Sequence, residues 1–260
     1  MKRWAILITI VFCVGLALIA FIRSSPATVI PSPITSTPSA TPVIAAKKIP
    51  TITIGTEQFT YAVIRVQTIP SVSLIPNFTK PKDVESRMKE NNCTSAINGG
   101  FYDKAGKPLG YFQTGTSIVG SKIDSDLVNG FVWADASGAA VISTRLPHET
   151  FRFAIQTGPM LVFDGNKLPL NIRNDTRARR MVAAKSMDNQ LLFLTVYSAD
   201  SVFDGPLLGD LPTSVMAVST KENLNIADAI NLDGGSASAF YSGDTSLSEL
   251  TSVGSIFCVK

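Results

Sequence analysis

Two short stretches of the chain place a polar side chain directly before two glycines, and each follows an apolar run. They are Asn98-Gly99-Gly100 and Asp233-Gly234-Gly235. Glycine allows positive φ and close approach of the backbone to a ligand, and successive amides in such a turn can hold an anion. Both stretches also fit plain hairpin turns, because Asn-Gly and Asp-Gly are strong turn signals.

The second stretch carries a carboxylate with a hydroxyl three residues later. An aspartate at a strand end, flanked by apolar residues, can have its pKa tuned by burial for proton transfer. We therefore interpret Asp233 as a catalytic carboxylate, with Ser236 and the amides of Gly234 and Gly235 holding a substrate oxygen. Asp103, shortly after the first stretch, is a second candidate carboxylate.

Further candidates lie between the two stretches. Arginine matches phosphate through planar, permanently charged donors. Arg180 directly precedes a β-type run, so we expect it at a strand start as a phosphate clamp, whereas Arg177 and Arg179 are expected to line a loop. Gln156 stands before Gly158-Pro159, a structural turn, and is interpreted as an amide for a sugar hydroxyl.

The order of these blocks resembles the phosphodiester glycosidase family. Along the chain come INGGFYD, QTGPML, an arginine before an Ala-rich strand, and NLDGGSASAFY. The resemblance spans residues 51–260 and implies an enzyme that removes a sugar from a glycosyl phosphodiester. It also implies a site in these positions: Asn98, Gly99, Gly100, Asp103, Gln156, Gly158, Pro159, Arg180, Asp233, Gly234 and Ser236. Ala184 and Ala237 depart from the family pattern by small changes that bear on substrate fit.

The resemblance suggests a mechanism, and rival functions remain open. Glycosyl transfer to water usually needs a carboxylate pair, but phosphate is a fair leaving group, so an arginine clamp would replace much of a general acid's work. Asp233 would then act at the sugar and Arg180 at the phosphate, with Asn98 orienting the substrate. The main alternative is a non-catalytic cell-wall or polysaccharide-binding module. A phosphodiesterase that cuts the P–O bond would need a metal cluster.

The sequence predicts no metal site and no other cofactor. The single histidine, His148, lies in a Leu-Pro-His-Glu-Thr stretch typical of a surface loop. A structural calcium held by carbonyls together with Asp103 or Asp233 would leave no clear motif and stays open.

A single α+β domain with a mixed, largely antiparallel sheet and a few helices is expected over residues 51–260. Short β-branched and aromatic runs, punctuated by Gly, Pro, Asn or Asp, predict strands. Helices are predicted only over residues 82–91, after Pro81, and over residues 212–223. The predicted strands cover residues 59–67, 95–97, 131–134, 140–142, 153–155, 160–163, 181–184, 191–197, 227–232 and 255–259.

The amino-terminal part indicates export and a membrane address. Residues 4–22 form an apolar run that would span roughly 29 Å as a helix, and Lys2 and Arg3 precede it. Residues 1–23 are therefore interpreted as a retained transmembrane anchor, with a cleaved signal peptide as the alternative. The Pro/Ser/Thr-rich segment 24–50 is interpreted as a stalk, which leaves the domain on the extracytoplasmic side.

Charge and cysteine content add two expectations. Residues 1–50 hold five basic and no acidic residues, which leaves 18 basic against 20 acidic residues in the domain. A nucleic-acid partner would require a basic stripe on the domain, so none is expected. Cys93 and Cys258 are the two cysteines beyond the apolar run. An oxidising compartment would permit a bridge between them, but the sequence does not give their separation.

Overall fold

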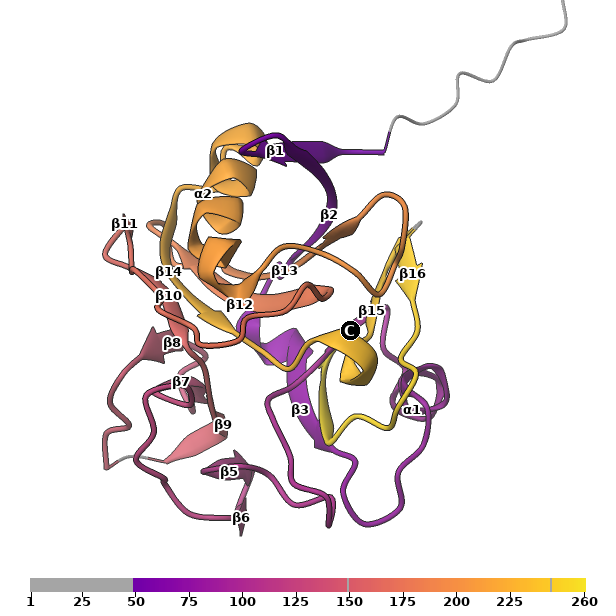
Figure 1. Ribbon diagram of the computed structural model, residues 1–260. Coiled ribbons are helices and arrows are strands. Elements are labelled where there is room, and N and C mark those ends of the chain that lie inside the picture. The colour runs from indigo at the N-terminus through magenta and orange to yellow at the C-terminus, as the bar shows by residue number, and fades with distance from the viewer. Residues whose placement is uncertain (1–48, 149, 244) are drawn as a thin grey trace, which may run out of the picture. The chain divides into compact units, whose positions relative to one another are not determined.

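Antiparallel strands dominate the computed structural model, which describes residues 49–148, 150–243 and 245–260. The largest sheet has seven strands in the order β1-β2-β13-β12-β14-β10-β11 (Figure 1). Its strands are β1 (Thr51–Ile54), β2 (Glu57–Arg65), β13 (Leu191–Ser198), β12 (Arg180–Ser186), β14 (Ile226–Asn231), β10 (Met160–Phe163) and β11 (Asn166–Lys167). Residue pairs such as Val182 and Asn231 fix the register of the central strands β12 and β14.

Two five-stranded sheets complete the β structure. The order β16-β15-β4-β17-β3 joins β16 (Thr245–Leu247), β15 (Phe240–Ser242), β4 (Ser95–Asn98), β17 (Ser255–Val259) and β3 (Val72–Pro76). The order β6-β5-β9-β7-β8 joins β6 (Ser117–Val119), β5 (Phe112–Thr114), β9 (Phe151–Thr157), β7 (Gly130–Asp135) and β8 (Ala140–Ser143). All strand pairings among the described residues are antiparallel, so the α+β class and the largely antiparallel character are confirmed, but the expected single mixed sheet is three antiparallel ones.

The main core lies where the inner faces of the three sheets meet. Alternate residues of each strand point to one face, so Met181 and Ala183 of β12 enter this core while Val182 enters a second one. Phe153 of β9 and Phe193 of β13 both lie against Phe257 of β17, with ring centroids 5.7 and 5.0 Å apart. The aromatic contacts thus join all three sheets.

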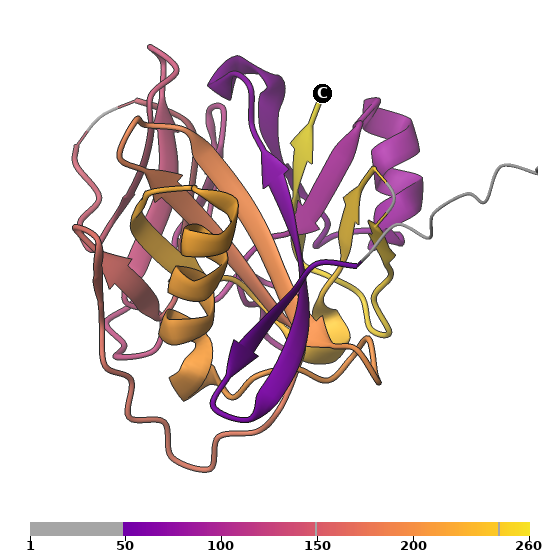
Figure 2. The ribbon, with the colours of Figure 1, turned by 90° about the horizontal axis from the view of Figure 1, so that it is seen from above.

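The two predicted helices are confirmed, with small shifts at their ends. α1 (Val84–Asn91) begins after Asp83, whose carboxylate accepts a hydrogen bond from the Ser86 amide at 2.7 Å, and packs on β4 and β17. α2 (Leu211–Glu222) buries Leu211, Val215 and Val218 against the seven-stranded sheet (Figure 2). Three short 3-10 turns complete the elements: η1 (Ile69–Ser71), η2 (Leu208–Asp210) and η3 (Gly235–Ala237).

Cys93 and Cys258 form a disulfide, which decides the question that the sequence left open. Cys93 follows α1, and Cys258 lies in β17 opposite Ala96 of β4. The bridge therefore fastens the helix to the strand pair that leads to Asn98.

The predicted anchor at residues 1–23 and nearly all of the stalk lie outside the described residues. Within the part of the chain that the structure describes, neither helix has the length and apolar character needed to cross a membrane.

Candidate active site

The two glycine turns, 135 residues apart, meet in space at the ends of β4 and β14. The Asp233 amide donates to the Gly99 carbonyl at 3.1 Å. Asn98 Nδ2 donates to the carbonyls of Asp233 and Gly99 at 2.8 and 3.0 Å, and Asn98 Oδ1 accepts from the Ala239 amide at 2.9 Å. The Asn98 side chain is buried, and both its nitrogen and its oxygen bond to backbone groups, so it holds the two turns together. Its predicted role in orienting a substrate stays a prediction.

Asp233 carries a carboxyl group with an altered proton affinity. Burial raises the pKa of Asp233 to about 7, and the opposing influence is a hydrogen bond from the Gly234 amide at 2.9 Å. The causes of the shift include no neighbouring cation and no second carboxylate. A group with this pKa exchanges protons at neutral pH, which is the property that general acid–base catalysis requires.

The glycines serve close packing more than ligand binding. A Cβ on Gly99 would lie 2.2 Å from Ser255 Oγ, and one on Gly234 would lie 2.8 Å from the Arg179 carbonyl oxygen. Gly100 faces Thr157, whose Oγ1 would lie 3.1 Å from an added Cβ.

The amides predicted to hold an anion are already engaged. The Gly99 amide donates to the Ser255 carbonyl. The Gly234 amide donates to the Asp233 carboxylate, and the Gly235 amide donates to the Arg179 carbonyl. Each of these amides thus has a protein acceptor in the structure, and substrate binding by Gly234 and Gly235 stays a prediction.

Ser236 and Asp103 occupy different environments. Ser236 is exposed, and its hydroxyl has only a long contact of 3.4 Å from Thr251 Oγ1. The Asp103 carboxylate accepts from the amides of Ala105 and Lys107 at 2.8 and 2.9 Å in an exposed turn. The structure thus leaves Ser236 accessible beside Asp233, whereas Asp103 is occupied as a turn-forming residue.

Gln156 has no free hydrogen-bonding group for a sugar. Its Oε1 accepts from the amides of Tyr111 and Ile123, and its Nε2 donates to the carbonyls of Ile123 and Val128 at 2.7 and 2.9 Å. The side chain is buried and holds the segment between β6 and β7 against β9. In this structure Gln156 has a structural role, and its contact with a sugar stays a prediction.

Arg180 stands at the first position of β12, as predicted. Its guanidinium donates from Nε to the Pro206 carbonyl at 2.9 Å and from Nη2 to the Thr176 carbonyl, and it forms an ion pair with Asp175 at 3.4 Å. Burial lowers the pKa of Arg180, which Asp175 partly offsets. The Arg180 Cα is 4.0 Å from the Cβ that Gly234 lacks, so the backbone of Arg180 adjoins the Asp233 turn.

The preceding arginines divide in a way the sequence did not predict. Arg177 is exposed and pairs with Glu57, in line with a loop position. Arg179 is instead completely buried and is the largest such side chain in the described residues. A basic run ordinarily indicates a solvated loop, so no local signal distinguished Arg179 from its neighbours.

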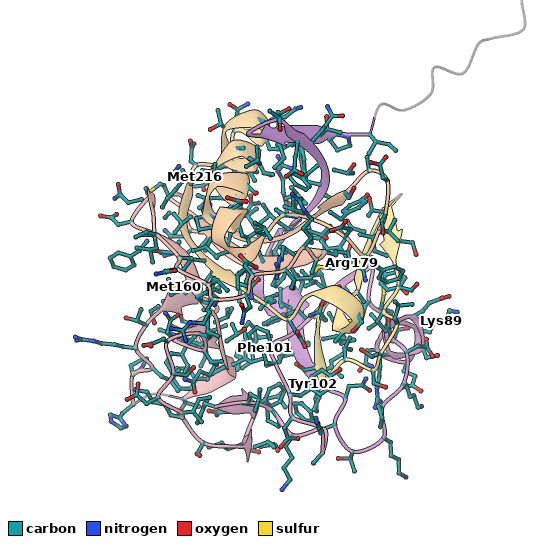
Figure 3. The ribbon with its side chains drawn as sticks, viewed as in Figure 1. Lys89, Phe101, Tyr102, Met160, Arg179 and Met216 are labelled. Atoms are coloured by element: carbon teal, nitrogen blue, oxygen red, sulfur yellow. A yellow bond between two sulfur atoms is a disulfide. The ribbon has the colours of Figure 1, made fainter. Side chains whose placement is uncertain are left out.

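Tyr102 is a neighbour of Asp233. It lies in the INGGFYD stretch, but the sequence alone predicted no role for it. Its hydroxyl donates to the Ser252 carbonyl. Burial raises the pKa of the Tyr102 phenol, and the charges of Asp233 and Glu249 raise it further. Figure 3 shows Tyr102 and Phe101 below Arg179, on the segment that follows the first glycine turn. The one sequence signal that could have marked Tyr102 as a site residue is its position directly after Gly99-Gly100-Phe101.

A polar cavity of about 390 Å³ lies next to this group of residues. Its wall includes Tyr241, Glu249, Thr251 and Ser252, and the last two contact Ser236 and Tyr102. Asp233 itself does not line the cavity. The cavity therefore adjoins the carboxylate without containing it. Across residues 49–148, 150–243 and 245–260, no three His, Cys, Asp or Glu side chains gather as a metal site.

The site and fold together define a class: an antiparallel α+β domain with a partly buried carboxylate where two glycine turns meet. The chain belongs to the phosphodiester glycosidase family, whose sequence model matches residues 91–260. The resemblance noted from the sequence is thereby confirmed. A comparison with curated proteins finds no match.

Several solved structures resemble the fold, among them the following three. The zebrafish N-acetylglucosamine-1-phosphodiester alpha-N-acetylglucosaminidase catalytic domain, auto-inhibited by its pro-peptide, has a TM-score of 0.63 at 17% identity and covers 82% of this chain and 81% of its own. A hypothetical protein from Synechocystis has a TM-score of 0.56 at 13% identity, with 82% and 61% covered. A putative exported protein from Burkholderia pseudomallei has a TM-score of 0.50 at 12% identity, with 78% and 74% covered. At these identities the likeness establishes the fold alone.

Proposed function

We propose that this protein is a glycoside hydrolase that releases a sugar from a glycosyl phosphodiester of a cell-envelope or extracellular glycan. Membership of the phosphodiester glycosidase family supports the reaction class. The observation that carries the proposal is the partly buried Asp233 carboxyl at the junction of the two family motifs, where desolvation raises its pKa to about 7. The substrate class also takes support from the zebrafish enzyme, whose name describes a glycosaminidase that acts on a phosphodiester.

In the proposed reaction, Asp233 acts at the anomeric carbon as a base toward water. The water oxygen bonds to that carbon, the bond from carbon to the phosphodiester oxygen breaks, and its electron pair leaves with the phosphomonoester. The proton from water passes to Asp233. A carboxylate whose pKa is raised by burial is a stronger base than a solvated one, and phosphate leaves with little protonation. Activity should therefore be lost as pH falls through about 7.

Arg180 is proposed to meet the phosphate. Asp175 and the carbonyls of Pro206 and Thr176 fix its Nε and Nη2, and Nη1 has no hydrogen-bond partner in the described residues. A guanidinium held in place in this way stabilises charge that develops on the leaving group without having to reorganise. The exposed Ser236 hydroxyl is proposed to contact the substrate between the two centres.

The protein is further proposed to lie outside the cell on a membrane anchor and to act without a cofactor. An apolar run over residues 4–22 supports a single-pass anchor with the domain outside the cell, and the Cys93–Cys258 disulfide suits an oxidising compartment. No nucleic-acid partner is proposed. The reaction uses side chains alone, so activity is expected to survive treatment with EDTA.

A product analysis tests the proposal. The full chain, purified in detergent, is incubated with a panel of glycosyl phosphodiesters in ¹⁸O-water. Free sugar carrying the label, together with an unlabelled phosphomonoester, is the expected result because the bond to the anomeric carbon breaks. Label in the phosphate would indicate P–O cleavage, and tight binding without products would indicate a glycan-binding module. Either of these outcomes contradicts the proposal.

A further inference from the structure

Arg179 is a buried cation that the proposed reaction does not use. Its Nε donates to Ser238 Oγ at 2.8 Å, and its Nη2 donates to the carbonyl oxygens of Ser238 and Ser248, the latter at 2.8 Å. The guanidinium also lies over the Phe203 ring, 4.8 Å from its centroid. Burying an arginine costs free energy unless such groups compensate its charge, so this arrangement is specific.

The backbone of Arg179 also contacts the turn that follows Asp233. Its carbonyl accepts the Gly235 amide at 2.9 Å and fills the space beside Gly234. Ser238, which accepts from the guanidinium, donates its own hydroxyl proton to the Gly235 carbonyl at 2.5 Å. Arg179 therefore closes a ring of hydrogen bonds around the residues that follow Asp233, from Gly235 to Ser238.

The first turn secures the other end of Asp233. Asn98 holds the Asp233 carbonyl, and Gly99 accepts its amide. The only bond that the structure gives to the carboxylate is the one from the Gly234 amide. The burial of this carboxylate thus depends on the path of the backbone on both sides of it, and Arg179 fixes the path on the carboxyl-terminal side.

We propose that Arg179 is a positioning residue for Asp233, which holds the turn 234–238 in the path that keeps the carboxylate partly buried at the reaction centre. The inference rests on the proposed function, because it assigns Arg179 a place in that site. Arg179 does not contact the substrate, since its side chain is fully buried.

The titratable groups around this arrangement are few. Glu249, Tyr241 and Tyr197 act on Arg179, whose pKa burial lowers to about 10, so it stays a cation at neutral pH. Tyr102 is the titratable neighbour of Asp233, and its phenol also stays protonated there because its pKa is raised. A change near pH 7 can therefore be assigned to Asp233.

The test compares Arg179→Lys with Arg177→Lys, a neighbouring exposed arginine whose partner is Glu57. Lysine keeps the charge but lacks the planar fork that reaches Ser238 and Ser248 together. In the full chain with ¹³C-labelled aspartate, the Asp233 carboxyl is identified by its absence from Asp233→Asn and titrated by NMR. In Arg179→Lys the carboxyl should become hydrated and its pKa should fall by roughly one pH unit or more. Arg177→Lys should match the wild type.

Kinetics on the cleaved substrate provide the second measurement. We expect kcat of Arg179→Lys to fall roughly tenfold to a hundredfold with KM nearly unchanged, because the carboxylate is misplaced while substrate contacts remain. Ser238→Ala removes the two bonds of the Ser238 hydroxyl, with Arg179 Nε and with the Gly235 carbonyl, but keeps those from Arg179 to the carbonyls of Ser238 and Ser248. It should therefore lower the Asp233 pKa and kcat in the same direction as Arg179→Lys, but by less. A folded Arg179→Lys with unchanged Asp233 pKa and kcat would overturn the proposal.

The proposal can also be tested if Arg179→Lys does not fold or if no substrate is cleaved. If Arg179→Lys does not fold, Ser238→Ala decides alone, and wild-type values in it overturn the proposal. If no glycosyl phosphodiester is cleaved, the proposed function fails but the titration still reports on positioning. A lowered Asp233 pKa in Arg179→Lys would then support the role of Arg179 in holding the turn, and an unchanged one would refute it.

Discussion

The two glycine turns have nearly the same sequence pattern and opposite roles. At Asn98-Gly-Gly the polar side chain is a neutral amide with three hydrogen bonds to backbone groups. At Asp233-Gly-Gly it is a carboxyl with one, from the Gly234 amide. Asn98 is the last residue of β4 and Asp233 comes shortly after the end of β14, and the two turns contact each other through the Asp233 amide and the Gly99 carbonyl.

The difference shows how one turn supports the chemistry of the other. A buried amide whose donors and acceptor are satisfied rigidifies its surroundings, whereas a buried carboxyl with a single partner has a raised pKa. The hydrogen bonds of Asn98 go to backbone groups, including the Asp233 carbonyl. The first turn is thus a support, and the second carries the titratable group.

Exchanging the carboxyl for an amide in the second turn should have the largest effect. Asp233→Asn keeps the shape and the acceptor for the Gly234 amide but removes the base, so kcat should fall by on the order of a thousandfold or more while the fold is kept. Steady-state kinetics and circular dichroism measure the two quantities. Asp103→Asn, in its exposed turn, is the matched control and should retain full activity. Substantial turnover by Asp233→Asn would remove Asp233 from the mechanism.

The raised pKa should also make stability depend on pH. The folded protein binds a proton at Asp233 up to about pH 7, whereas the unfolded chain releases it near 3.9. The neutral carboxyl therefore contributes stability that is fully present below about pH 4 and is lost as pH rises through 7, by up to about 4 kcal/mol. Urea unfolding of wild type and Asp233→Asn across this range measures the difference. A difference that does not change with pH would show that Asp233 is solvated.

The reciprocal exchange in the first turn should damage the fold instead. Asn98→Asp replaces two donated hydrogen bonds with a carboxylate facing the carbonyl oxygens of Gly99 and Asp233. We expect a loss of about 3 kcal/mol in the free energy of unfolding, since buried acceptors lose their donors. Chemical denaturation at pH 7 provides the measurement. If Asn98→Asp instead were as stable as the wild type and only inactive, Asn98 would belong to the substrate contacts.

Replacing a glycine should destabilise each turn by a smaller amount and for a different reason, steric crowding at Gly99 and backbone strain at Gly235. Gly99→Ala places a Cβ against Ser255 Oγ and should cost about 2 kcal/mol, part of which Ser255→Ala should restore. Gly235 has φ of +64°, and an added Cβ would make only an ordinary contact of 3.8 Å with Ala178 Cβ, so Gly235→Ala should cost about 1 kcal/mol through backbone strain. Gly235→Asn should cost less, because asparagine tolerates this conformation. Thermal unfolding of the four variants compares them, and equal costs for alanine and asparagine at position 235 would contradict strain as the cause.

Much of the fold followed from local pattern. Both helices and ten strands lie where apolar periodicity and turn residues predicted them, because those signals are contained within each segment. The strands β1, β3, β5, β6, β11, β15 and β16 were not predicted. Most of them have only two to four residues, which offer too little pattern, and β3, β5 and β15 pair with strands far along the chain. The division into three sheets depends on the same distant pairing.

By itself the sequence determined the family, the order of the site blocks and Asp233 as the carboxyl to test, because motif order and residue type are written along the chain. Only the tertiary structure decided which polar groups remain available. It assigned Asn98 and Gln156 to internal hydrogen bonds, buried Arg179 while Arg177 stayed exposed, and joined Cys93 to Cys258. The physical reason is that burial, and with it pKa and hydrogen-bond demand, is set by what distant strands bring against a residue.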